Sequence, residues 1–115
     1  MYRLKYSEIL EDDQSEARDR ERIALTRSIE MLKAAEEPDA TPSEIADAVF
    51  FTSKLWTALI EDLADSGNML PKKLRAQIIS IGIWILRELE NIRNRQSRDF
   101  ADVRAVSESI RDGLL

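Results

Sequence analysis

Residues 71–96, PKKLRAQIISIGIWILRELENIRNRQ, decide the fold class of this chain. Their apolar residues recur every three or four positions, which is the period of an α-helix. Two apolar stripes cover most of the circumference, and Trp84 widens them. A helix that is apolar on nearly every side is buried, so we expect this one at the centre of an all-helical fold. The main stripe is Leu74, Ile78, Ile81, Ile85, Leu89 and Ile92, and the second is Ile79, Ile83 and Leu86.

Gly82 lies in the middle of this predicted helix, where glycine costs about 1 kcal/mol relative to alanine. The simplest compensation is the close approach of another backbone. We therefore expect Gly82 to mark a packing contact and not a catalytic position.

The segment before this helix contains a strong helix start. In Thr41-Pro42-Ser43-Glu44, a threonine N-cap precedes a proline at the first helical position and a glutamate at the third. This pattern predicts a helix that runs to about Asp65, with Gly67 as the left-handed residue after its end.

Two further helices complete the prediction, one from about Asp13 to Ala35 and one from Phe100 to Asp112. The last has the apolar stripe Phe100, Val103, Val106 and Ile110. Residues 1–12 are expected to form an irregular arm that packs on the rest through Tyr2, Leu4, Tyr6, Ile9 and Leu10. The predicted fold is all-α: a compact bundle of about four helices in a single domain over residues 1–115, with the arm at 1–12 and the bundle at 13–115.

Composition excludes several classes of function. The 115 residues include no cysteine and no histidine, and only three glycines. Thiol chemistry, disulfides and the commonest general base and metal ligand are therefore absent, and no glycine-rich phosphate loop can be written. We expect no catalytic residue, cofactor or metal. No apolar run approaches the length of about 20 residues that a membrane span needs, and no secretory signal is evident, so we expect a cytoplasmic protein without membrane contact.

Charge is unevenly distributed along the chain. The net charge is −5, yet residues 71–98 contain seven basic and two acidic residues. One interpretation is an RNA contact at the basic end of the third helix. We prefer the alternative that these cations complement the helix dipole and neighbouring acidic helices, because no aromatic platform for bases accompanies them. Direct nucleic-acid contact is not expected.

The second and third predicted helices carry more large apolar residues than a small core requires. Trp56 and Trp84 either fill the core or line a groove that receives an amphipathic partner helix. In the second interpretation charged residues border the groove. The groove would be lined by Trp56, Leu59, Ile60, Ile81, Trp84 and Ile85, and bordered by Glu61, Asp62 and Arg87.

Several motifs resemble the signature of the flagellar biosynthesis regulator FlaF over essentially the whole chain. They are Tyr6-Ser7-Glu8-Ile9-Leu10, Leu55-Trp56, Leu59-Ile60-Glu61-Asp62-Leu63, Asn68, Leu70-Pro71, Leu74-Arg75-Ala76, Ile79-Ser80-Ile81-Gly82-Ile83-Trp84 and Ile110-Arg111-Asp112-Gly113-Leu114. The resemblance implies a non-enzymatic cytoplasmic protein needed for flagellin production and filament assembly. It also implies action in opposition to FlbT, a repressor of flagellin translation, and binding of flagellin in the manner of an export chaperone.

On this reading the partner is an amphipathic terminal helix of flagellin, held in the predicted groove. Two other modes of action remain open from the sequence. The chain could act through FlbT or flagellin mRNA without holding flagellin, or the same apolar face could form a homodimer.

Overall fold

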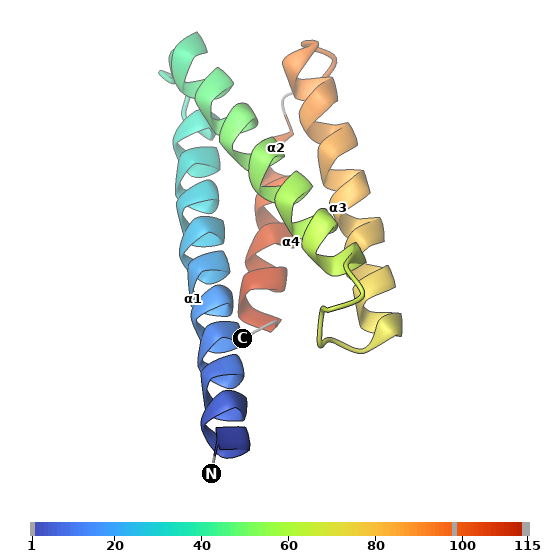
Figure 1. Cartoon of the computed structure of the whole chain (residues 1–115). Helices are drawn as coiled ribbons and strands as arrows, with labels where there is room; N and C mark the ends of the chain where they lie inside the picture. Colours follow the sequence, from blue (N-terminus) through green and yellow to red (C-terminus); the bar gives the residue numbers. More distant parts are fainter. Residues whose placement is uncertain (1, 98, 114–115) are drawn as a thin grey trace.

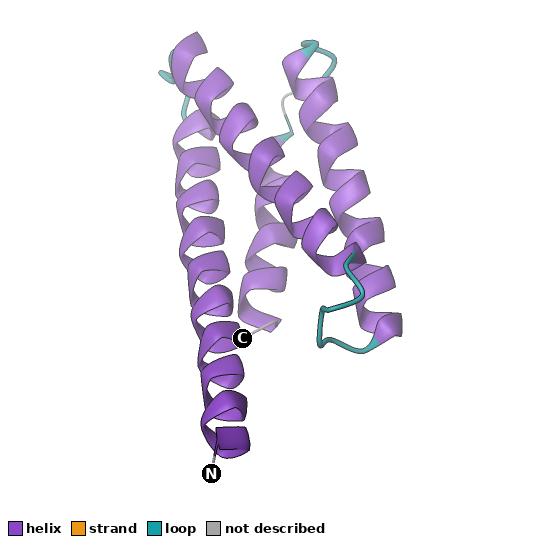
Figure 2. Ribbon diagram, viewed as in Figure 1, coloured by secondary structure: helices purple, strands orange, loops and turns teal. Residues whose placement is uncertain are grey.

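In the part of the chain that the structure describes, four α-helices occur and no strand. The computed structural model describes residues 2–97 and 99–113, with the backbone alone for residues 2–15. The helices are α1 (Tyr2–Glu36), α2 (Pro42–Ala64), α3 (Lys72–Arg93) and α4 (Phe100–Gly113) (Figure 1, Figure 2). The predicted all-α class and the number of helices are confirmed.

Helix α1 begins earlier than the sequence predicted. Its backbone is helical from Tyr2, so the expected irregular arm over residues 1–12 is wrong for residues 2–12. The segment lacks an N-cap signal at its start, but it also contains no proline or glycine that would break a helix. At 35 residues α1 is about 52 Å long, and it accounts for most of the 59 Å length of the molecule. The expected packing of the arm through its side chains lies outside the described residues.

Helix α2 starts as its sequence indicates. The Glu44 N–H donates to Thr41 Oγ1 at 3.1 Å, and the Thr41 N–H donates to Glu44 Oε1 at 3.5 Å, which completes a capping box. At the other end Gly67 does not adopt the left-handed conformation that we predicted. Its N–H instead donates to Asp65 Oδ1 at 2.8 Å. An aspartate turn therefore ends α2, and glycine's conformational freedom is not needed there.

Helix α3 ends in a left-handed residue that is not glycine. Arg95 has φ 60°. Its N–H donates to the Ile92 carbonyl at 3.1 Å, and the Gln96 N–H donates to the Asn91 carbonyl at 2.8 Å. These two bonds form a Schellman motif, in which glycine usually occupies the position that Arg95 holds here.

The helices pack in the order α4, α1, α2, α3. Helix α2 lies along α3 on one side and α1 on the other, α4 lies along α1, and α3 meets α4 only over a short seam (Figure 1). The expectation that α3 is central holds for its buried stripe but not for its whole circumference. Leu74, Ile83 and Trp84 remain exposed, and α4 meets α3 over only a short seam.

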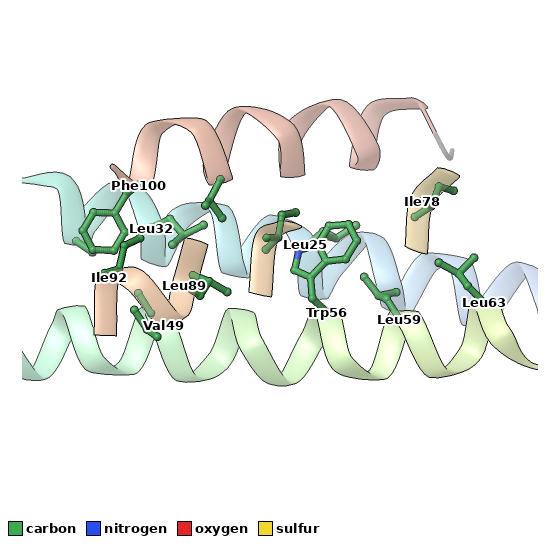
Figure 3. Packing of buried hydrophobic residues seen from close by; sticks show 14 residues of the cluster. Leu25, Leu32, Val49, Trp56, Leu59, Leu63, Ile78, Leu89, Ile92 and Phe100 are labelled. Carbon is green, nitrogen blue, oxygen red and sulfur yellow. The ribbon is translucent and has the colours of Figure 1, made fainter. Parts of the chain in front are cut away.

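The core runs along the middle of the bundle and takes residues from all four helices (Figure 3). Among them Leu25 and Leu32 of α1, Trp56 of α2 and Leu89 of α3 are fully buried. Two hydroxyls share this apolar space: Ser28 Oγ of α1 and Thr52 Oγ1 of α2 lie 2.6 Å apart and are both fully buried. Their mutual hydrogen bond offsets the cost of placing them there.

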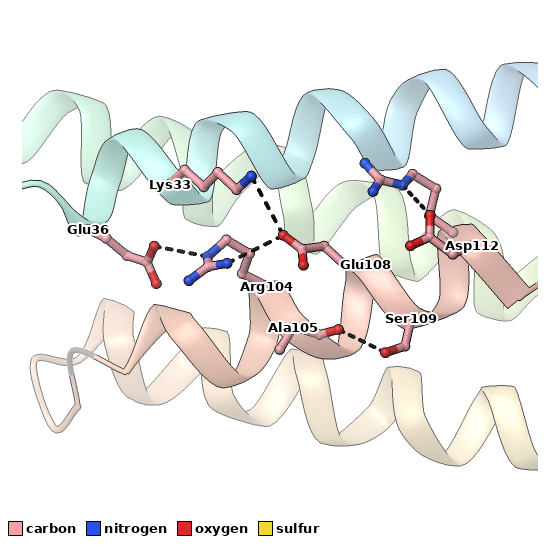
Figure 4. A network of polar contacts seen from close by, with 8 residues as sticks. Lys33, Glu36, Arg104, Ala105, Glu108, Ser109 and Asp112 are labelled. Atoms are coloured by element: carbon pink, nitrogen blue, oxygen red, sulfur yellow. Dashed lines mark hydrogen bonds and ion pairs between the residues drawn. The ribbon is translucent and has the colours of Figure 1, made fainter.

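Charged side chains join α1 to α4 (Figure 4). Arg104 Nε lies 3.0 Å from Glu36 Oε2 on α1, and Arg104 Nη1 lies 3.3 Å from Glu108 Oε1 on its own helix. Lys33 reaches the same Glu108 oxygen at 3.8 Å. The hydrogen bond to Glu36, with smaller help from Glu108, raises the pKa of Arg104 despite some desolvation. The guanidinium is therefore fixed between two carboxylates at the α1–α4 interface.

Candidate functional site

The residues of the predicted groove do not line one surface. Trp56 and Ile85 are fully buried, and Leu59 is only 7% exposed, so these three belong to the core. A partner cannot reach Trp56 or Ile85 in this conformation. Trp56 and Leu59 of α2 fill space between the packed helices, which sequence periodicity alone could not establish.

The other predicted residues are divided between two surfaces. Ile81 and Trp84 face α4, whereas Asp62 lines a different pocket together with residues of α1. Glu61 and Arg87 are exposed, and neither lines a described cavity with the apolar residues. Ile81 and Trp84 are therefore the part of the prediction that the fold places together on an accessible surface.

Ile60 has a packing role. A Cβ built on Gly82 would lie 2.9 Å from Ile60 Cδ1 and Cγ1 and 3.0 Å from Trp56 Cε3. The predicted close approach at Gly82 is thus present, but side chains of α2 make it and not another backbone. Gly82 lets the Trp56 ring and Ile60 lie directly against the α3 backbone.

An apolar groove runs between α3 and α4. It is wide open to solvent, has a volume of about 600 Å³ and is lined by no charged side chain, although 34% of the chain is charged. Trp84 is 37% exposed there and is its largest accessible side chain. The lining residues, which we call the α3–α4 groove, are Ser80, Ile81 and Trp84 of α3 and Ala105, Val106, Ser109 and Ile110 of α4.

The two serines do not make this groove polar. The Ser80 hydroxyl donates to the Ala76 carbonyl at 3.1 Å, and the Ser109 hydroxyl donates to the Ala105 carbonyl at 3.2 Å (Figure 4). Each hydroxyl donor is satisfied within its own helix. The groove therefore presents methylene, methyl and indole surface, together with small residues that let a bound backbone come close.

Sequence reasoning assigned Val106 and Ile110 to the core stripe of α4. In the structure Phe100, Val103 and Ser107 face inward, and Val106 and Ile110 are only half-buried. A signal was present: Val103 and Ser107 continue the helical spacing from Phe100, but a serine was not considered as a core residue. For this reason the sequence did not lead us to predict that residues of α4 line the groove.

A smaller pocket of about 150 Å³ lies between α1, α2 and the turn after α2, and Ile78 of α3 and Ile110 of α4 complete its lining. Glu21 and Asp62 line it with Arg18. Burial, followed by the negative charge of Asp62, raises the pKa of Glu21, and Arg18 opposes this shift. The pocket is an electrostatically unfavourable place for a carboxylate. In the described part of the chain no cluster of three or more acidic residues could hold a metal ion.

The turn between α2 and α3 explains other motif residues. Asn68 Nδ2 donates to the Asp62 carbonyl at 3.3 Å, and Asn68 Oδ1 accepts from the Leu70 N–H at 3.0 Å. Arg75 Nη1 donates to the carbonyls of Leu63 and Asp65, both at 3.2 Å. These bonds satisfy carbonyls at the end of α2 that the helix leaves free. Asn68 and Arg75 therefore hold the α2–α3 hairpin together.

These features define a small four-helix protein with an accessible, uncharged groove between two helices. No described helix combines the length and hydropathy required to cross a bilayer. The family model of the flagellar protein FlaF matches residues 2–114. The chain belongs to the FlaF family and is a flagellum-related protein. Neither the curated proteins nor the solved structures gave a match.

Proposed function

We propose that this chain is a non-enzymatic cytoplasmic regulator of flagellar biosynthesis that binds an amphipathic terminal helix of flagellin in the α3–α4 groove. By holding that helix it promotes flagellin synthesis and secretion, as an export chaperone does. Membership of the FlaF family supports the flagellar role. The groove supports the binding mode.

The observation that carries this proposal is the uncharged lining of the groove. Ile81, Trp84, Val106 and Ile110 supply apolar contact area, and the serine donors are satisfied. Exposed indole is a frequent energetic centre of protein interfaces. The residues span one to two turns of each helix, which matches a partner helix with anchors at positions i, i+3 or i+4, and i+7.

Calorimetric titration with the cognate flagellin, full-length and trimmed at either terminus, tests the proposal. We expect saturable one-to-one binding that is lost with one terminus. Trp84→Ser should weaken binding roughly tenfold or more, as loss of a central anchor does.

Ile83→Ser is the matched control. Ile83 is the neighbour of Trp84 on α3 and is 44% exposed, but it does not line the groove. The variant should bind flagellin like the wild type. Equal losses of affinity in both variants would count against the groove. If no form of flagellin bound, the proposal would fail, and action through FlbT or flagellin mRNA would be the alternative to test.

A further inference from the structure

A third cavity lies at the far end of the bundle, where α2 begins, α3 ends and α4 begins. It encloses about 890 Å³, a volume typical of sites that bind ligands or anchor side chains. Val49, Ile92 and Phe100 form its floor, and all three are buried (Figure 3). We call it the end pocket. It shares no lining residue with the α3–α4 groove.

Phe50 stands at the mouth of the end pocket with 64% of its surface exposed. The Lys54 ammonium lies 5.1 Å from the centre of its ring, within the range of a cation–π contact. An exposed phenylalanine continuous with a buried apolar floor is a surface that a partner side chain could cover. The neighbouring cation makes an anionic partner more favourable.

Basic side chains dominate the rim of the end pocket. Arg93 and Arg95 both line it, whereas Glu90 is its one acidic lining residue among those described. Glu90 is already paired with Arg93 at 2.9 Å. Arg95 makes no ion pair with a described residue. In a chain with net charge −5, this rim is a local exception that favours negative charge.

The backbone at Arg95 adds a second observation. Its φ of 60° is a conformation in which glycine is free of the strain that a Cβ causes. A residue with a side chain costs about 1 kcal/mol or more there, so folding alone would favour glycine. Residues held in such conformations cluster at functional sites, and the Arg95 side chain lines the end pocket.

We propose that the end pocket docks a short acidic segment of a partner protein. One aliphatic or aromatic side chain of that segment packs against Phe50 over the apolar floor, and its carboxylates pair with Arg95 and Arg93. The apolar floor favours a peptide over RNA, because an apolar side chain can fill it and a ribose–phosphate backbone cannot. This inference is independent of flagellin binding by the α3–α4 groove.

Selection from a phage-displayed pool of random dodecapeptides on the folded full chain tests the proposal. We expect enriched peptides in which leucine, isoleucine, phenylalanine or tryptophan adjoins aspartate or glutamate. An enriched peptide is then labelled and titrated by fluorescence anisotropy against the wild type and variants. Failure to enrich any peptide, or enrichment of basic or uncharged ones, would overturn the proposal.

Arg95→Gly is the decisive variant because it separates binding from folding. It should raise the melting temperature by removing the strained side chain, yet weaken peptide binding roughly fivefold, as loss of one partly exposed charge pair does. Phe50→Ser should weaken it roughly tenfold or more. Ile23→Ser, at a residue 68% exposed on α1, is the control and should bind like the wild type.

Two further outcomes would contradict the proposal. Wild-type peptide affinity in Arg95→Gly would show that the rim does not recognise carboxylates. Binding of a labelled oligouridine that falls steeply with salt, and that is lost in Arg95→Gly and Phe50→Ser, would assign the pocket to RNA instead.

Discussion

Ser28 of α1 and Thr52 of α2 place their hydroxyl oxygens 2.6 Å apart in the interior of the bundle, where each side chain is fully buried. This hydrogen bond fixes how α1 lies on α2, because each hydroxyl has its partner at only one relative position of the two helices. A buried polar pair inside an apolar core is therefore a determinant of register as well as of stability.

Ser28→Ala should destabilise the fold by about 1–3 kcal/mol, because it leaves the Thr52 hydroxyl buried without its partner. Thr52→Val should cost a similar amount for the converse reason. The double variant should cost clearly less than the two single costs together, since no polar group is then left unpaired. Urea unfolding of the three variants measures the coupling, and strict additivity would contradict the buried pair.

Gly82→Ala should destabilise the bundle by about 1–3 kcal/mol through overpacking. The new methyl group would lie within 3.0 Å of Ile60 and Trp56, and this outweighs the gain of about 1 kcal/mol in helix propensity. Adding Ile60→Ala removes the two closest atoms and should make the glycine replacement much less costly. If Gly82→Ala instead raised the melting temperature, the close contact between α2 and α3 would be refuted.

Glu21 makes stability depend on pH. Burial and Asp62 raise its pKa in the folded state, so the native protein binds the proton more tightly than the unfolded chain does. Its contribution to stability is therefore present below the ordinary carboxyl pKa of about 4.3 and is lost as the pH rises through the raised folded value. Glu21→Gln should melt at a higher temperature than the wild type at pH 7, and the difference should shrink in acid. An equal difference at both pH values would argue against this linkage.

Arg104 should be the most important charged residue of the α1–α4 interface. Arg104→Met loses the bonds to Glu36 and Glu108, which leaves Glu36 without its cation and Glu108 with only the longer contact to Lys33. We expect a lower melting temperature, partly restored in Arg104→Lys, which keeps the charge but not the fork of donors. Lys33→Ala is the control: its side chain is 58% exposed and its contact to Glu108 is 3.8 Å long, so its effect should be small. A loss as large in Lys33→Ala as in Arg104→Met would contradict this ranking.

The starts of helices were predicted correctly where the signal lies within a few neighbouring residues. Thr41 and Glu44 sit in one capping box, and Pro71 directly precedes α3, so short-range chemistry determines both starts. The end of α3 could not be predicted in this way. A left-handed residue was expected at Gly67, but Asp65 and Asn68 supply other hydrogen-bond partners at the end of α2. The structure instead has a left-handed residue after α3, at Arg95, where no local signal predicted it.

The candidate groove was only partly predictable. Ile81 and Trp84 were identified from their excess on α3, but their partners Val106 and Ile110 were not. Which apolar residues stay accessible depends on how α4 is rotated against α1, and that rotation depends on contacts between residues far apart in sequence. Trp56 shows the same limit. The apolar residues on α2 have the same spacing in the sequence whether another helix of this chain or a helix of a partner covers them.

The pairing of α1 with α4 also constrains the order of events in folding. The Arg104–Glu36 contact joins residues 68 positions apart, whereas α2 and α3 form a hairpin closed by the short turn around Asn68. Closing the longer loop costs more chain entropy before any contact repays it. The hairpin should therefore form first and α4 should dock late, so that loss of the Arg104–Glu36 contact speeds unfolding and leaves the folding rate nearly unchanged.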